Sequence, residues 1–416
     1  MSLTVAHAEP YPSPPQPVGV GFGERALLLF GGLVLLCGAV LWADHGANVE
    51  KTDFSMTYVG ARIVYEGQGA RLYDLQKQAS LRASLYTRAE GLLFEHPPFE
   101  ALFLSPLAAL PYKTAYLLWG LINAAIWLVL PGLLRPYAPV PRDDLAYFIL
   151  WFLFAPLGLA LYQGQSSLIL LLLYTLSFIS LKRGQEMRGG ILLGLGLFKF
   201  QFVLPFAIIF LFRRKWRFLS GFALSAMALG LFSLWAVGWQ GILSYVHLLL
   251  NIAGHPDDSS YGKAIGMATV QGFTYTILGT VLGSRVIGWV VAAISFSMLA
   301  FAARRWRPAK NPRSDVAFDL EFAAALVISL VTGFHMFLHD LSPLLLGMFL
   351  IAAHVPGRAR LALRAVLGIM LAVLWIPPLQ LALVAWHRVS LMFPVLMILA
   401  FAALRLATPE EPEPAI

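Results

Sequence analysis

One aspartate stands where the chain changes from apolar to polar. Asp53 follows the first apolar run, residues 26–42, and opens a stretch that stays polar to about Phe99. A carboxylate at the boundary between water and lipid can take a proton from a substrate hydroxyl, which is the task of a general base. The position of Asp53 therefore indicates an enzyme that works on a lipid-borne substrate. As an alternative, Asp53 caps a helix that begins at Phe54, because aspartate accepts backbone N–H bonds at such a position.

Other polar side chains interrupt or border the later apolar runs. Charged groups at membrane depth are costly and are functional candidates by default. We expect the following side chains to converge with Asp53 on one cavity: His96, Gln163, Gln165, Lys199, Gln201, His335, His339 and Asp340. For Lys199 the alternative is that its long side chain only snorkels to the membrane interface.

Two of these histidines have a spacing that can bind zinc. His335 and His339 are four residues apart, one turn of a helix. The pair lacks the glutamate of a His-Glu-x-x-His arrangement, so a metalloprotease site is disfavoured. Asp340 could orient a histidine or cap the next helix. We expect neither a metal ion nor another cofactor.

The composition is that of a protein embedded in a bilayer. The chain has 59% hydrophobic and only 12% charged residues, against about 25% charged residues in soluble domains. Apolar stretches of about 20 residues can cross the bilayer core, and they must do so as helices that satisfy their own backbone groups. The single cysteine, Cys37, excludes an internal disulfide. The net charge of +8 sits largely in short loops, which points to membrane topology and not to nucleic acid.

The sequence predicts an all-α polytopic membrane domain at residues 24–406, between disordered cytoplasmic tails at 1–23 and 407–416. Basic loops, such as the one from Arg213 to Arg217, should lie inside the cell. The long loop 44–111 is then extracytoplasmic. About twelve spans are expected, at residues 26–42, 112–134, 145–162, 166–181, 189–198, 202–212, 218–237, 286–303, 318–333, 341–354, 361–379 and 389–404.

Two segments depart from simple crossings. Residues 189–212 begin and end at basic loops but are too short for two full spans. A broken or re-entrant hairpin that holds Lys199 at membrane depth is the simplest solution. In the outer loop, residues 54–65 and 75–89 are amphipathic at helical spacing, which predicts helices that lie along the membrane surface.

The order of several motifs resembles glycosyltransferase family 87. The resemblance runs from about Asp53 to Arg217 and is carried by Asp53 with Tyr58, Gly67 and Leu72-Tyr73-Asp74, by His96-Pro97-Pro98-Phe99 with Leu104-Ser105-Pro106-Leu107 and Leu110-Pro111, by Trp119 and Asn123, by Gly164-Gln165, and by Lys199-Phe200-Gln201 with Leu204-Pro205. The chain departs from the pattern at His96, where tyrosine commonly precedes the two prolines, and at Ser166, near which asparagine is often found.

The resemblance implies a GT-C fold and the transfer of a hexose, with mannose as the first candidate, from a polyprenyl-phosphate sugar. The acceptor would be a lipid or glycan hydroxyl on the outer face of a bacterial inner membrane, among the membrane lipids. Asp53 would be the base, with Lys199 and His335 at the donor phosphate. His96, Gln165, Gln201, His339 and Asp340 would line the cavity. A transporter or flippase that uses these groups as a relay is the main alternative, and a non-catalytic scaffold is a weaker one.

Overall fold

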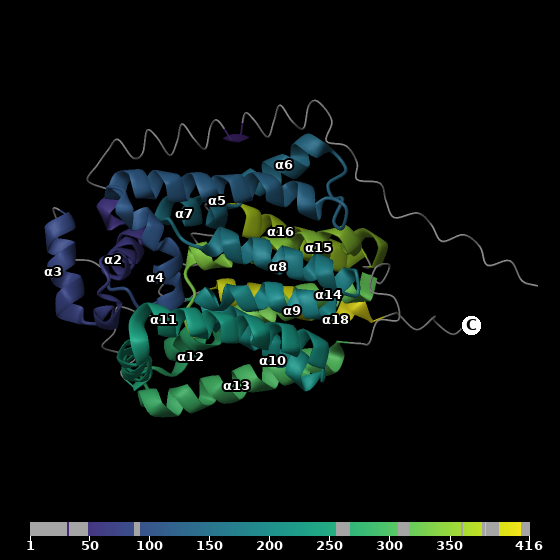
Figure 1. The fold of residues 1–416 in the computed structure, drawn as a ribbon. Helices are drawn as coiled ribbons and strands as arrows, with labels where there is room; N and C mark the ends of the chain where they lie inside the picture. Colours follow the sequence, from purple (N-terminus) through teal and green to yellow (C-terminus); the bar gives the residue numbers. More distant parts are fainter. Residues whose placement is uncertain are drawn as a thin grey trace, which may run out of the picture.

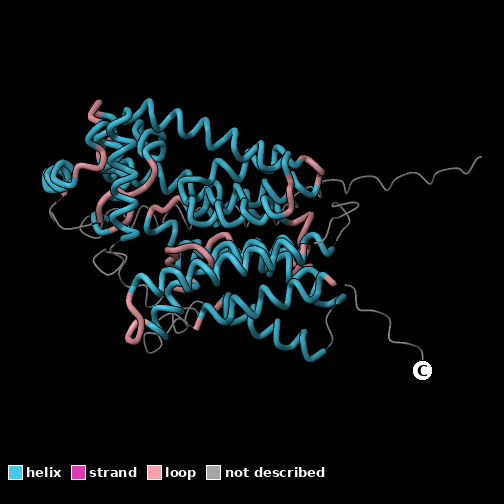
Figure 2. Tube along the Cα trace, turned by 90° about the horizontal axis from the view of Figure 1, so that it is seen from below, coloured by secondary structure: helices cyan, strands magenta, loops and turns pink. Residues whose placement is uncertain are grey.

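The computed structural model describes residues 31–32, 49–86, 92–254, 267–306, 316–358, 361–376, 379 and 391–408. Within these residues all regular structure is helical and there is no strand (Figure 1, Figure 2). The expected all-α class is therefore confirmed. The first apolar run apart from residues 31–32, the tail 1–23 and residues 409–416 of the other tail lie outside the described residues.

Five described segments are long and apolar enough to cross a membrane. A sixth results if α6 (Asp144–Leu153) and α7 (Ala155–Gln163), which meet at 50°, count as one span. These helices fit a polytopic membrane protein, and the number of twelve spans stays a prediction. The five are Tyr112–Leu134 (α5), Glu186–Phe212, Trp216–Asn251, Ser284–Arg305 (α13) and Leu338–Val355.

The centre of the bundle is α14 (Val316–Val331). Every residue of α14 from Phe318 onward is buried, as expected for a helix that is apolar on nearly all sides. Around it pack α10, α13, α15 (Leu344–Arg358) and α18 (Met392–Ala407). The helices α8 (Ser167–Lys182) and α16 (Leu361–Trp375) complete this part of the bundle (Figure 1).

Between α8 and α11 the chain forms a helical hairpin. Its arms are α9 (Glu186–Gly194) and α10 (Phe200–Phe212), joined by the 3-10 turn η4 (Leu195–Lys199). By length and composition these 27 residues could make one crossing, but a straight helix of that length would separate its ends by about 40 Å. Instead Lys215 Nζ lies 2.7 Å from Glu186 Oε1. The chain therefore reverses direction, and Lys199 lies at the tip.

The hairpin packs closely against α11 (Trp216–Gly254). A Cβ on Gly190 would lie only 1.9 Å from the backbone oxygen of Phe218, so glycine is required for this approach. The ring of Phe218 also stacks on Phe210 of α10 at 4.0 Å. Further along, α11 is kinked at Gly238, where φ is 66° and only glycine is unstrained. After the kink come α12 (Val270–Leu278) and α13.

The described residues of the first long loop, 49–86 and 92–111, fold over one end of the bundle (Figure 1). The loop differs from the expected surface helices, because nine of the twelve residues of α2 (Phe54–Tyr65) are buried. The reason is that α4 and η3 pack on α2 and cover its second face. Only α3 (Leu75–Leu85) is largely exposed. The other short helices are η1 (Val49–Lys51), η2 (Gly69–Arg71), α4 (Pro98–Leu104) and η3 (Ser105–Ala109).

Candidate active site

Asp53 lies at the start of α2 but does not cap it. Its side chain makes no capping hydrogen bond. Instead the carboxylate accepts a hydrogen bond of 2.6 Å from Nε2 of Gln165, and its backbone N–H donates to Oε1 of Gln163 at 3.2 Å. Both glutamines come from the turn between α7 and α8, so this turn fixes the place of Asp53. The carboxylate borders the cavity described below, and the capping alternative is not what the structure has.

Lys199 is held at the tip of the hairpin by two oxygen atoms. Its Nζ donates to Oε1 of Gln165 at 2.9 Å and to Oδ1 of Asp340 at 2.5 Å. The side chains of Lys199 and Asp340 are only 6% and 1% exposed, so the ammonium group does not snorkel to an interface. A buried charge requires a partner of opposite sign, and Asp340 is that partner.

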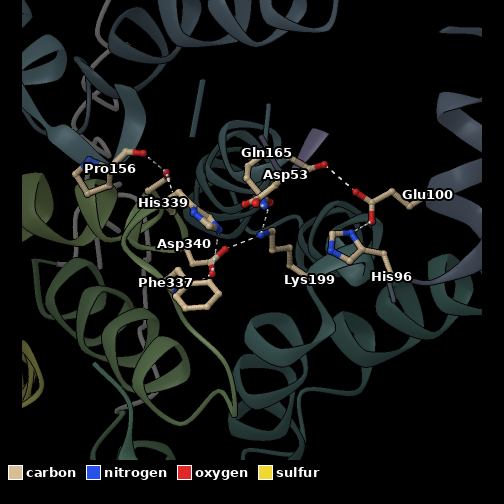
Figure 3. Close-up of polar contacts among 11 residues, drawn as sticks. Asp53, His96, Glu100, Pro156, Gln165, Lys199, Phe337, His339 and Asp340 are labelled. Carbon is tan, nitrogen blue, oxygen red and sulfur yellow. Dashed lines mark hydrogen bonds and ion pairs between the residues drawn. The ribbon is translucent and has the colours of Figure 1, made fainter. Parts of the chain in front are cut away.

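One glutamine thus joins the candidate base to the buried cation. Gln165 offers its amide hydrogen to Asp53 and its carbonyl oxygen to Lys199 (Figure 3). This orientation follows from the charges, since a carboxylate only accepts hydrogen bonds and an ammonium group only donates them. The chain Asp53, Gln165, Lys199 and Asp340 brings four elements together through side-chain contacts alone.

Asp340 also orders the segment that carries the two histidines. It lies in the 3-10 helix η5 (Leu338–Leu341), and its Oδ2 accepts the backbone N–H of Phe337 at 2.9 Å. The same oxygen is 3.5 Å from Nε2 of His339. Asp340 therefore faces a histidine, one of the two roles considered for it, and the helix that it caps is the 3-10 turn to which it belongs. Among the described residues no group of three or more His, Cys, Asp or Glu side chains could hold a metal ion.

The protonation of His335 is governed by its burial. Burial lowers the pKa of its imidazole to about 4, with nearby Lys199 and His339 adding to the effect and Asp340 opposing it. The ring is therefore neutral at physiological pH. It can offer a ligand a hydrogen bond but not a positive charge.

His96 forms a second close polar pair, with Glu100, which the sequence did not single out. His96 Nδ1 is 2.6 Å from Oε2 of Glu100, one turn further along in α4. The other oxygen of Glu100 accepts a hydrogen bond from Ser166 Oγ at 2.9 Å. The i,i+4 spacing of His96 and Glu100 was the signal that could have pointed to this glutamate.

Most of these groups line one cavity of about 1290 Å³, and Gln165, Glu100 and Ser166 lie behind its wall. Among the described residues the acidic side chains that line it are Asp53, Glu95 and Asp340, and the basic ones besides histidine are Lys199 and Arg285. Glu95 and Arg285 were also missed in the sequence. Gln165 supports the wall through its contacts with Asp53 and Lys199. The remaining expected site residues that line the cavity are His96, Gln163, Gln201, His335 and His339.

These features define a helical membrane protein with a large cavity, whose mainly apolar wall carries a cluster of polar and charged side chains. Comparison with protein families adds the identity, since the family described as glycosyltransferase family 87 matches residues 94–333, more than half of the chain. The chain belongs to this family and is a membrane glycosyltransferase. Neither the curated proteins nor the solved structures contain a match. The transporter alternative finds no support. The matched range includes His96, Gln165 and Lys199, whereas Asp53 precedes it and His335, His339 and Asp340 follow it.

Proposed function

We propose that the protein transfers a hexose, with mannose as the first candidate, from a polyprenyl-phosphate sugar to a lipid or glycan hydroxyl. The reaction would take place at the outer face of a bacterial inner membrane, on a GT-C scaffold. One observation carries the proposal: a single amide, Gln165, links the carboxylate of Asp53 to the ammonium group of Lys199 beside the same cavity. A base and a cation so placed suit a hydroxyl acceptor and a phosphate leaving group.

The chemistry needs one displacement. The acceptor oxygen forms a bond to the anomeric carbon of the sugar, and Asp53 takes the hydroxyl proton. The bond between the anomeric carbon and the phosphate oxygen breaks, and its electron pair stays with the polyprenyl phosphate. A single displacement inverts the anomeric centre. Hydrolysis of an ordinary glycoside also needs a carboxylic acid to protonate the leaving oxygen, but a phosphate leaves without that help.

Lys199 and His335 would stabilise the charge that develops on the phosphate. Lys199 supplies a positive charge, and Asp340 holds its ammonium group at the tip of the hairpin. His335, which is neutral, supplies a hydrogen bond. The wide cavity extends to residues of α13, including Gly288 and Trp289, and this apolar side suits the isoprenoid chain of the donor.

The test is transfer by the purified protein in lipid nanodiscs. Polyprenyl-phosphate mannose, polyprenyl-phosphate glucose and a nucleotide sugar are each supplied with a lipid extract, and the products are identified by mass spectrometry. We expect a glycolipid with an inverted anomeric centre from a polyprenyl-phosphate sugar only. Transfer from the nucleotide sugar alone would show that the proposed donor is wrong. Lipid glycans from cells with and without the gene then identify the acceptor.

A further inference from the structure

The leaving phosphate needs more positive charge than Lys199 supplies. Polyprenyl phosphate leaves with a second negative charge that the donor diester does not have. The charge of Lys199 is already balanced in part by Asp340. Among the described residues the other basic side chain of the cavity wall besides histidine is Arg285, the second residue of α13, which is exposed to solvent. Asp53, Glu95 and Asp340 on the same wall repel an anion, so a protonated histidine would strengthen the binding of phosphate.

His96 is the histidine whose surroundings favour that proton. Its Nδ1 faces Glu100 at 2.6 Å, a length typical of a bond assisted by charge. His335 is held neutral by burial, and His339 faces Asp340, whose other oxygen binds Lys199. In the described part of the chain the close polar contacts of the Glu100 carboxylate are His96 and the neutral Ser166.

The burial of Glu100 indicates that His96 carries a positive charge. The side chain of Glu100 is 7% exposed, and that of His96 is 19% exposed. A carboxylate so deeply buried is stable only beside a positive charge or several hydrogen-bond donors. Because Nδ1 faces Glu100, the ring nitrogen left to face the cavity is Nε2 (Figure 3).

We propose that Glu100 is a positioning residue that holds His96 as an imidazolium, whose Nε2–H donates a hydrogen bond to the leaving phosphate. This inference rests on the proposed function, since it takes polyprenyl phosphate as the leaving group. His96 transfers no proton in the step and stabilises charge only.

The experiment measures how polyprenyl monophosphate binding depends on pH. The full-length protein in nanodiscs is titrated with this product between pH 5 and about 9, by isothermal calorimetry. Affinity should fall as the pH rises, because a neutral imidazole at position 96 no longer offers the phosphate a positive charge. In Glu100→Gln the amide keeps a hydrogen bond to Nδ1 but loses the charge, so the fall should move about 1–3 pH units lower, the usual effect of removing a close opposite charge. The phosphate has its own pKa of about 6, which is the same for every variant.

Three further variants separate positioning from structure. In His96→Gln the part of the fall in affinity that depends on Glu100 should vanish. The double variant His96→Gln/Glu100→Gln should then bind polyprenyl phosphate with the same affinity as His96→Gln at every pH. Ser166→Ala, which removes the other hydrogen bond of Glu100, should leave the midpoint in place. The other ionisable groups near the pair stay unchanged in all four variants: Tyr73, Glu95, Lys199, Tyr245, His335 and His339.

The outcomes distinguish the two proposals. If the wild-type protein binds polyprenyl phosphate but Glu100→Gln has the same midpoint, the inference about the pair is overturned and the proposed function stands. The inference is also overturned if Glu100→Gln weakens binding as much in the His96→Gln variant as in the wild-type protein, because Glu100 then acts on the structure and not through His96. If the wild-type protein does not bind polyprenyl phosphate at any pH, the proposed donor is wrong and the inference fails with it.

Discussion

Replacing Asp53 by asparagine should slow sugar transfer by about 10²–10⁴-fold, the usual contribution of a general base. This corresponds to about 2.7–5.4 kcal/mol in the activation barrier. The structure indicates that the loss is chemical. Asparagine can accept the hydrogen bond from Gln165 through its own carbonyl oxygen, so the bridge to Lys199 survives. Helix α2 loses no cap, because Asp53 makes no capping bond.

The assay is single-turnover transfer of labelled sugar at saturating donor, with donor affinity measured in parallel. Donor affinity should be preserved, because the base acts on the acceptor. Asp74→Asn is the matched control in the same outer loop. Asp74 does cap its helix, accepting the N–H of Lys77 at 3.1 Å, and asparagine caps about as well, so transfer should be normal. Wild-type turnover by Asp53→Asn would refute the assignment of the base.

Lys199→Met should weaken donor binding and also destabilise the fold by about 3–5 kcal/mol, because buried Asp340 loses its cation. The double variant Lys199→Met/Asp340→Asn should be more stable than Lys199→Met, because no unpaired carboxylate remains. Equal free energies of unfolding of the two variants in denaturant would show that the ion pair does not stabilise the fold. Gly190→Ala should lower the melting temperature, since its Cβ would meet the backbone of Phe218. Gly230→Ala, whose Cβ would meet nothing within 4 Å, should preserve or raise it, as alanine favours helix. With Cys37→Ser, cysteines at Ser80 and Gln185 should label with a membrane-impermeant reagent from outside and inside respectively, and reversed labelling would overturn the orientation.

Much of the bundle could be predicted because long apolar runs must become helices in a membrane. The bounds expected for α5 and α2 are those of the structure, Tyr112–Leu134 and Phe54–Tyr65. The break around Lys199 was also visible, since basic loops enclosed a segment too short for two spans. The burial of α2 was not, because an amphipathic pattern does not reveal that neighbouring helices will cover its polar side.

The sequence indicated individual residues of the candidate site but not which of them contact one another. Lys199 and Asp340 each stood out, but their ion pair joins positions 141 residues apart. Their pairing depends on where the hairpin and η5 meet in space. Glu100 was missed because an acidic residue in the first turn of a helix is a common and unremarked feature. Only the fold shows that Ser166, far along the chain, shares its carboxylate.

The hairpin of α9 and α10 fixes how deep Lys199 sits. One arm is anchored by the contact of Gly190 with α11 and by the ion pair of Glu186 with Lys215. The depth of the tip is then set by the number of residues between these anchors and Lys199. One inserted residue in α9 would lift the tip by about 1.5 Å and rotate it by about 100°. Substitutions on the lipid-facing sides of the arms leave that length unchanged, so this segment should tolerate changes in composition far better than changes in length.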